Sequence, residues 1–439
     1  MVVPLNMQGR SRDLAVWLAG ARPRAVVHEP GNAELAQALA SLEFAPLRVV
    51  AGTSTDEACV AWQAASGPTQ RLPGAAHERI GADSDAVIVY TSGTTGAPKG
   101  VVLTHANLAA NTDAIIDYLA LGAADSTVSV LPFYYSYGAS VLHSHLAVGG
   151  RLVLEPNLVF PHPMVEAMAR ERVTGFAGVA STFSLLLDRV ALQDYDLSSL
   201  RYLTQAGGPM SEALACRVRA AFPGARLFQM YGQTEATARI AWLPPERADD
   251  KRGSVGVAVA GTRIEVRDLD GRPLPAGVDG EVCVQGPGIM RGYWDDPEAT
   301  AGVLRDGWLH TGDLGHLDED GFLFLSGRGS DMIKTGAHRV HPNDVEEVIA
   351  ELPGVVEVAA TGIDDATLGQ VIKAWVVVRG EQGRVEPPGA DAIRAHCRTR
   401  IAAYKVPKVV EFVESLPKTA SGKLRRHMLS GDCRPKEMV

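Results

Sequence analysis

The sequence predicts an α/β protein with a large N-terminal domain, residues 1–327, and a small α+β C-terminal domain, residues 328–439. Short apolar segments alternate with amphipathic ones from about residue 85 to residue 232. Short segments with Asp-Gly and Gly-rich turns follow Pro244-Pro245, and the pattern changes again after Gly327-Arg328. Strands that alternate with helices indicate βαβ units and a doubly wound, mixed or parallel sheet.

The alternating region begins the large domain's sheet. We expect strands at 86–90, 127–133, 151–154, 201–204 and 226–230, and helices at 104–119, 163–173, 182–188 and 211–222. Leu108, Ile115 and Leu119 have helical spacing, and Thr104 is a suitable N-cap for their helix. Ligands of such sheets bind beyond the carboxyl ends of the strands.

The remaining elements are shorter. Residues 246–327 are expected to form a β-barrel-like subdomain of the large domain, with antiparallel strands at 263–267, 281–285 and within 307–326. In the C-terminal domain we expect a helix at 343–352, a strand at 371–378, a helix at 391–401 and a strand at 409–413. Asn343 and Glu346 are predicted to form a capping box on the first of these helices.

Composition excludes several classes of protein. A chain of 439 residues, 46% of them hydrophobic, is long enough for two or three domains with their own cores. The net charge of −9 is spread along the chain and gives no sign of a nucleic-acid partner. The five cysteines are scattered without a CxxC pair, and neither a signal peptide nor a membrane-spanning run is evident. We therefore expect a cytoplasmic protein.

A glycine- and hydroxyl-rich segment follows the first strong strand: Tyr90-Thr-Ser-Gly-Thr-Thr-Gly-Ala-Pro-Lys-Gly100. Glycines let backbone N–H groups crowd an anion, hydroxyls add donors and Lys99 adds positive charge, which indicates a phosphate-binding loop. It is not a Walker A loop, because Lys99 precedes Gly100 instead of Ser or Thr. An ordinary Gly/Ser surface turn is the alternative that this segment alone leaves open.

Four later segments follow this loop: Tyr231-Gly-Gln-Thr-Glu235, Thr311-Gly312-Asp313, the stretch that begins at Gly327-Arg328, and Pro417-Lys-Thr-Ala-Ser-Gly-Lys-Leu-Arg425. In this order, over residues 85–426, the five resemble the AMP-forming adenylating superfamily. That superfamily includes acyl- and aryl-CoA synthetases, adenylation domains of peptide synthetases and beetle luciferases. Taken singly, the segments have ordinary alternatives: a solvated glutamate, a Gly-Asp turn or a basic tail.

The resemblance implies that a carboxylic acid is activated by ATP as its acyl-AMP, with release of pyrophosphate. The acyl group then passes to the thiol of CoA or of a carrier-protein phosphopantetheine. The implied nucleotide-binding residues are Thr91, Ser92, Gly93, Thr94, Thr95, Gly96, Lys99, Gly207, Gly208, Tyr231, Gly232, Asp313, Arg328 and Lys334. The implied catalytic residues are Tyr135, Thr234, Glu235 and Lys423.

Each implied role has a chemical reason. Glu235 is expected to hold Mg²⁺, which shields phosphate repulsion, and Asp313 to accept hydrogen bonds from ribose hydroxyls. Lys423 is expected to stabilise the negative charge that grows as the acid attacks the α-phosphate. The small domain then rotates about a hinge near 328–331, withdraws Lys423 and presents residues 334–340, including Lys334, to a thiol channel.

Several positions depart from the superfamily pattern. Tyr135 stands where histidine is common, and the segment 131–138 has no aspartate for an amino group, which disfavours an α-amino acid substrate. Small residues at Ala180-Ser181 and Gly207-Gly208 are compatible with an aryl or medium-to-long fatty acyl group. Ser330 takes the hinge position usually held by Asp or Lys, and Ala337 takes the place of a glycine in the pantetheine path, so the thioester step is less firmly implied than adenylation.

The segment before the glycine-rich loop is short. Only 89 residues precede Tyr90, fewer than in typical members, so part of the first subdomain is expected to be missing. Two outcomes stay open: a partner in a homodimer completes the sheet edge or acyl pocket, or this edge is left open. His143 and His145 are two residues apart on a predicted helix, a spacing that does not align them as metal ligands. Two alternatives to a thiol ligase stay open: an acyl-AMP-forming enzyme with another acceptor, and a non-catalytic nucleotide-binding relative.

Overall fold

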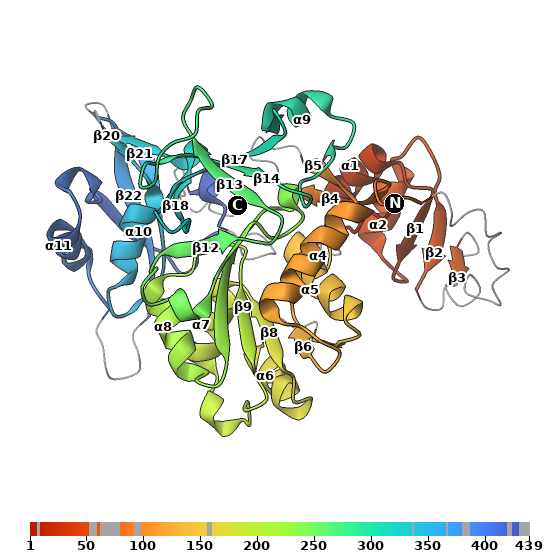
Figure 1. The fold of residues 1–439 in the computed structure, drawn as a ribbon, viewed down its shortest axis with the longest axis horizontal. Coiled ribbons are helices and arrows are strands. Elements are labelled where there is room, and N and C mark those ends of the chain that lie inside the picture. The colour runs from red at the N-terminus through yellow and green to blue at the C-terminus, as the bar shows by residue number, and fades with distance from the viewer. Residues whose placement is uncertain are drawn as a thin grey trace, which may run out of the picture.

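The computed structural model describes residues 1–6, 9–51, 59–61, 80–91, 98–155, 160–335, 338–365, 368–379, 387–418 and 424–429. A sheet of 12 strands forms its centre, with a small N-terminal sheet at one end and a C-terminal sheet at the other (Figure 1). The central sheet has a parallel half and an antiparallel half, joined by hydrogen bonds between β10 and β11.

The parallel half lies in the order β10-β9-β8-β6-β7. Its strands are β6 (Ser126–Ser129), β7 (Arg151–Leu154), β8 (Gly175–Gly178), β9 (Tyr202–Gln205) and β10 (Arg226–Tyr231). Helices α4 (His105–Leu119) and α5 (Ser136–Ala147) cover one face through Ile115, Tyr137 and neighbouring apolar side chains. Helices α6 (Pro161–Arg170), α7 (Ala180–Arg189) and α8 (Glu212–Ala221) cover the opposite face and enclose the largest apolar core.

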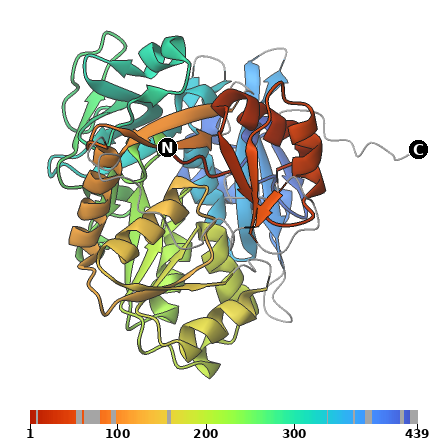
Figure 2. The ribbon, with the colours of Figure 1, turned by 90° about the vertical axis from the view of Figure 1, so that its right-hand side faces the viewer.

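The antiparallel half lies above the parallel half in both overall views (Figures 1 and 2). Its strands are β11 (Ala241–Leu243), β12 (Ser254–Ala258), β13 (Arg263–Arg267), β14 (Gly280–Gln285), β16 (Leu304–Arg305), β17 (Trp308–Leu317) and β18 (Leu323–Arg328). Helix α9 (Pro297–Val303) precedes β16, and β12 pairs with both β11 and β18. The strands predicted in 246–327 therefore continue the parallel sheet through one hydrogen-bonded path.

Two small sheets lie on the N-terminal side. β4 (Asp85–Thr91), β5 (Lys99–Thr104) and β15 (Gly292–Tyr293) pair antiparallel. β1 (Ala25–His28), β2 (Leu47–Val50) and β3 (Cys59–Ala61) pair parallel, with α1 (Ser11–Ala21) and α2 (Ala33–Ala40) beside them.

The C-terminal sheet has its own apolar core. Its strands are β19 (Ile333–Thr335), β20 (His338–Val340), β21 (Val355–Asp365), β22 (Gly369–Val378) and β23 (Val409–Phe412). Helices α10 (Pro342–Ala350) and α11 (Ala390–Arg400) pack on it through Val345, Ile349 and Ile393. Single 3₁₀ turns occur at Leu192–Asp194, Thr234–Ala236, Pro245–Arg247, Gly329–Asp331, Ala403–Lys405 and Arg426–Met428.

The α/β fold class is confirmed, with local differences. Thr104 caps α4 as expected, since its Oγ1 accepts a hydrogen bond of 3.1 Å from the N–H of Asn107. The predicted strand at 86–90 is present as β4, but it pairs with β5 outside the parallel sheet. Strands β5 and β8 were not predicted, because Lys99–Thr104 lies between a loop motif and a helix cap, and Gly175–Gly178 is short and glycine-bounded.

The predicted capping box on the first C-terminal helix is wrong. Helix α10 begins at Pro342 with His341 as its N-cap, so Asn343 lies inside the first turn. The carboxylate of Glu346 instead accepts hydrogen bonds from the backbone N–H of Ala360 and from the guanidinium of Arg426. Proline at the first helical position satisfies the start of the helix without a side-chain cap.

A glycine on β12 allows a close backbone approach to β11, within the antiparallel half of the sheet. Gly256 has φ +93°, and a Cβ at this position would lie 1.8 Å from the carbonyl oxygen of Trp242 on β11. We expect Gly256→Ala to lower the free energy of unfolding by more than about 3 kcal/mol, because β11 and β12 would have to separate.

Gly271→Ala is the matched control for this prediction, since Gly271 has φ +80° but open space around its Cβ position. It should lose only the roughly 1–2 kcal/mol of left-handed strain. Thermal unfolding followed by circular dichroism compares the two variants. Equal shifts in apparent Tm would contradict the close-approach argument.

Candidate active site

The chain turns back sharply after β10, at the carboxyl edge of the parallel half-sheet. A Cβ on Gly232 would lie 2.0 Å from the carbonyl oxygen of Ala238, so only glycine permits this turn. The N–H of Ile240 donates to the carbonyl of Tyr231 at 2.9 Å and closes the loop. The 3₁₀ turn η3 (Thr234–Ala236) lies within it, which places Tyr231 and Glu235 at the same edge.

Tyr231 joins the parallel half-sheet to the antiparallel one. Its hydroxyl donates a 2.6 Å hydrogen bond to Oδ2 of Asp313, on β17. Burial raises the pKa of Tyr231 well above its ordinary value, and the Asp313 charge raises it further. The phenol therefore stays protonated at neutral pH and remains a donor to the carboxylate.

Arg328 contacts the same carboxylate from β18. Its Nε donates to Oδ1 of Asp313 at 3.1 Å, while 43% of the Arg328 side chain remains exposed. Burial lowers the pKa of Arg328, but the charges of Asp313 and Glu235 among others raise it, and the net shift is upward. The guanidinium thus lies in the field of both site carboxylates.

Glu235 and Lys99 meet at Tyr293, on β15. The Tyr293 hydroxyl donates to Oε1 of Glu235 at 2.9 Å, and Nζ of Lys99 lies 4.9 Å from the centre of the Tyr293 ring. Burial and the Glu235 charge raise the pKa of Tyr293, so this hydroxyl is a permanent donor. A carboxylate and an ammonium group are thereby held at one edge of the site.

The glycine-rich loop is described only at its two ends. Thr91 closes β4 and is the register partner of Lys99 at the start of β5. Its Oγ1 donates to the carbonyl of Lys99 at 3.4 Å. The predicted residues Ser92, Gly93, Thr94, Thr95 and Gly96 lie outside the described residues.

The ends of β9 and α5 border the same edge. Gly207 has φ +88°, and the side-chain amide of Gln205 donates to the carbonyl of Gly208 at 2.8 Å. Tyr135 is the N-cap residue of α5, with its ring 4.5 Å from that of Tyr134. In the first turn, Ser136 Oγ lies 3.3 Å from Thr234 Oγ1, which brings the positive end of the helix dipole to η3.

Not every predicted residue joins this group. Lys334 is exposed on β19, where its backbone N–H donates to the side chain of Gln370. Lys423, Gly336 and Ala337 lie outside the described residues. His145 is buried, with its ring nitrogens 2.8 Å from the carbonyl of Val141 and the hydroxyl of Tyr202, so it serves packing.

Tyr293 and Gln233 are site residues that the sequence analysis missed. Gln233 lies between two motif residues, and its amide Nε2 is buried with no hydrogen-bond partner in the part of the chain that the structure describes. A buried donor without a partner beside Glu235 fits a ligand rich in acceptors, such as a nucleoside triphosphate. At this loop Glu235 offers a carboxylate, a type of ligand that Mg²⁺ accepts.

The family model for AMP-binding enzymes matches residues 1–294, and the model for the AMP-binding enzyme C-terminal domain matches residues 344–423. A feruloyl-CoA synthase of an Amycolatopsis species is 36% identical over 422 residues, which cover 96% of this chain and 82% of that enzyme.

Solved structures agree with the sequence relatives. The amide bond synthetase McbA from Marinactinospora thermotolerans superposes with a TM-score of 0.84 at 32% identity, over 96% of this chain and 82% of that one. The o-succinylbenzoate CoA synthetase of Bacillus subtilis, in complex with the acyl-adenylate intermediate OSB-AMP, gives 0.82 at 27% identity, over 98% and 82%.

Among the described helices, none is both long and apolar enough to cross a membrane. The family models together match most of the chain, and the segments that carry the resemblance lie within or between the matched regions, except that the last segment ends two residues beyond them. The chain therefore belongs to the AMP-binding enzyme family, and its relatedness to CoA synthases and ligases makes it an AMP-forming acid–thiol ligase.

Proposed function

We propose that this chain activates a carboxylic acid with ATP, releases pyrophosphate, and transfers the acyl group from acyl-AMP to the thiol of CoA. The observation that carries the proposal is the convergence of Glu235, Asp313 and Arg328 at one sheet edge. Relatives that include a CoA synthase and a CoA synthetase with a bound acyl-adenylate support both half-reactions.

Asp313 is the proposed ribose ligand. Tyr231 and Arg328 each use one of its two oxygens, and an ionised carboxylate has about four acceptor positions. It can therefore accept two ribose hydroxyls while both protein donors hold its orientation. Gly207 and Gly208 would lie along the adenine ring, since a Cβ on Gly208 meets open space.

Glu235 is the proposed Mg²⁺ ligand, with phosphate oxygens and water completing the shell. The ion, when bound, would shield the phosphate charges and assist departure of pyrophosphate. Tyr293 holds Oε1 of Glu235 in place, and Lys99 adds a positive charge beside it. Thr234 and the first turn of α5 offer donors to the phosphates or to the attacking carboxylate, with Tyr135 at the helix start.

Lys423 is the proposed catalytic lysine, delivered by a domain of residues 328–439 that turns about 328–331. The described contacts around this hinge are consistent with a movable joint. Arg379 of this domain, with its side chain 51% exposed, reaches Asp188 of the large domain at 3.9 Å. Such long, partly exposed ion pairs contribute little and break easily. Rotation would then bring Lys334 toward the thiol.

CoA is the proposed acceptor because the sequence relatives are CoA ligases. A carrier-protein phosphopantetheine presents the same thiol and is the alternative within this reaction. An amine acceptor is a second alternative, since one structural relative is named an amide bond synthetase. The three acceptors are distinguished by measuring AMP release. It should depend on CoA, on a carrier protein or on an amine, according to which one accepts the acyl group.

ATP–pyrophosphate exchange, measured with Mg²⁺ across fatty, aryl and amino acids, tests adenylation. Exchange with at least one acid class is expected, and Lys423→Ala should reduce it by more than about 100-fold while ATP binding stays nearly intact. Lys408→Ala is the control, because Lys408 forms only a surface pair with Asp365 at 3.7 Å. Unchanged exchange in Lys423→Ala would refute the assignment of this lysine.

Tyr293→Phe tests whether the Tyr293 hydroxyl holds Glu235, the proposed Mg²⁺ ligand, in place. Removing the hydroxyl frees Oε1 of Glu235, so we expect the Mg²⁺ concentration for half-maximal exchange to rise by about 10-fold. Tyr195→Phe is the matched control, since Tyr195 is remote and lies 3.4 Å from His162. An unchanged Mg²⁺ requirement in Tyr293→Phe would show that the Tyr293 hydroxyl does not support the metal ligand.

We propose that the N-terminal sheet mediates a homodimer. Val27 is 56% exposed, Leu47 53% and Val60 37%, on adjacent strands of β1–β3. Burying such side chains against a second copy gives roughly 1.5–3 kcal/mol each. Light scattering after size exclusion should show a dimer that becomes a monomer in Val27→Glu, whereas Val16→Glu, on α1, should leave it intact. A monomeric parent protein would refute this interface.

A further inference from the structure

Arg239 is a buried cation at the end of the loop that carries Glu235. The residue is 4% exposed, and its guanidinium lies 4.4 Å from the centre of the Tyr137 ring. Its Nε lies 3.2 Å from the sulfur of Met230, and its Nη1 donates to the carbonyl of Ala238 at 3.4 Å. The Tyr118 phenol is a further hydrogen-bond partner of this guanidinium. These partners, a sulfur, a carbonyl and a phenol, are all uncharged, so none of them balances the charge of the guanidinium.

Within the described part of the chain, no carboxylate forms an ion pair with Arg239. Other partly buried arginines there do have one. The Arg267 side chain is 14% exposed and pairs with Glu265 at 2.8 Å, and the Arg426 side chain, 19% exposed, pairs with Glu346. An arginine does not deprotonate in proteins, so a buried one without an anion is energetically costly.

The neighbouring side chains do not supply the missing charge. Burial raises the pKa values of Tyr118, Tyr137 and Tyr202, so these phenols are neutral near pH 7. Burial lowers the pKa of His145, which is therefore a neutral ring. Asp125, which acts electrostatically on His145, already pairs with Arg201 at 2.9 Å.

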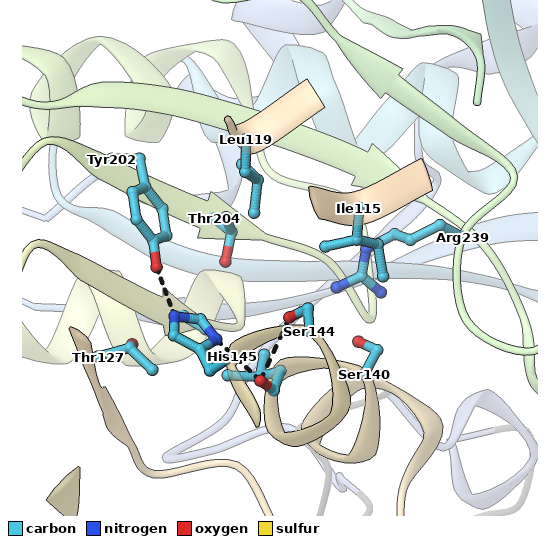
Figure 3. Close-up of a pocket in the computed structure, with 11 residues that line it drawn as sticks. Ile115, Leu119, Thr127, Ser140, Ser144, His145, Tyr202, Thr204 and Arg239 are labelled. Atoms are coloured by element: carbon cyan, nitrogen blue, oxygen red, sulfur yellow. Dashed lines mark hydrogen bonds between the residues drawn. The ribbon is translucent and has the colours of Figure 1, made fainter. Parts of the chain in front are cut away.

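A small cavity lies in front of the guanidinium (Figure 3). Arg239 points toward Ser140 and Ser144 of α5, with Thr204 and His145 across the space. The two serine hydroxyls donate to the carbonyls of their own helix at 2.7 and 3.3 Å. The room for the centre of a water molecule is about 10 Å³, enough for roughly one water.

Helix α5 connects this cavity with the reaction site. Ser136 contacts Thr234 at the nucleotide edge, and Ser140 and Ser144 follow on the same helix face at intervals of four residues. The rise of about 1.5 Å per residue places the cavity about 6–12 Å from that edge. A carboxylic acid bound for adenylation beside Ser136 would extend toward Arg239.

We propose that the acid this enzyme activates carries a second carboxylate, which reaches this cavity and pairs with Arg239. The substrate class is thus a dicarboxylic acid, aliphatic or aryl. Its far carboxylate lies about 6–12 Å from the reacting one, the length of one to two turns of α5. This inference rests on the proposed adenylation. A bidentate carboxylate supplies the planar acceptor pair that the guanidinium lacks.

The test is ATP–pyrophosphate exchange with acids matched in carbon number, such as octanoate against suberate, and with benzoate against terephthalate. We expect kcat/KM to favour the diacid of at least one pair by about 100-fold or more. Arg239→Met should remove most of that preference, and Arg239→Lys should keep part of it. Equal use of mono- and diacids by the parent enzyme, or equal losses for both in Arg239→Met, would overturn the proposal.

A second measurement separates this proposal from failure of adenylation. In thermal unfolding with ATP present, the diacid should raise the apparent Tm of the parent protein but not that of Arg239→Met. Without ligands, Arg239→Met should be as stable as the parent or more so, because an unpaired buried charge is gone. A marked loss of stability would assign Arg239 a structural role instead. If no diacid raises the apparent Tm of the parent protein, the proposal is overturned. This readout does not require the enzyme to catalyse exchange.

Discussion

The tight turn after β10 is the constraint on which the site depends. Gly232 approaches Ala238 so closely that a side chain would collide with its carbonyl, and the loop therefore closes directly onto Tyr231. Closure fixes three chemical groups in one short segment: the phenol of Tyr231, the carboxylate of Glu235 and the guanidinium of Arg239. Each then faces a different neighbour, β17, β15 or α5.

The mixed sheet explains how distant segments reach that loop. Parallel strands end together and leave a crevice at their carboxyl edge, as in other open α/β sheets. The antiparallel strands continue the same hydrogen-bonded path and bring Asp313 and Arg328 to the crevice from about 80 or more residues away in sequence. The buried Tyr231–Asp313 hydrogen bond locks the two halves together, and it is charge-assisted, hence stronger than a neutral one.

Much of this architecture follows from local sequence pattern, and the rest does not. The helical spacing of apolar residues and a suitable N-cap residue predict α4 and its Thr104 cap. Strand β7 lies at the residues predicted for it. The pairing of β4 with β5 depends on tertiary contacts, which an apolar run such as 86–90 does not encode. Likewise, α10 begins at Pro342 and not after Asn343, because proline is favoured at the first helical position. Asn343 therefore cannot be the N-cap.

Some residues of the candidate site could likewise be predicted from the sequence, and others could not. Glycines, hydroxyls and charged residues in ordered segments indicated Glu235, Asp313 and Arg328, and the family resemblance assigned their roles. Tyr293 and Gln233 carry no such signal, since a lone tyrosine or glutamine matters only through the neighbour it reaches in the fold. Tyr135 replaced an expected histidine, and its phenol at the start of α5 leaves that helix end to supply the positive potential.

Arg239 shows why a site residue can conflict with stability. Arg328, from the adjoining half-sheet, has Asp313 beside it and is partly exposed, so its charge is stabilised without ligand. Arg239 is more deeply buried and lacks such a partner among the described residues, although a methionine of similar size would fill the same space. A fold retains an unfavourable buried charge when another molecule completes it. The direction of the guanidinium, toward the helix face that begins at the nucleotide edge, indicates that this molecule is the acid itself.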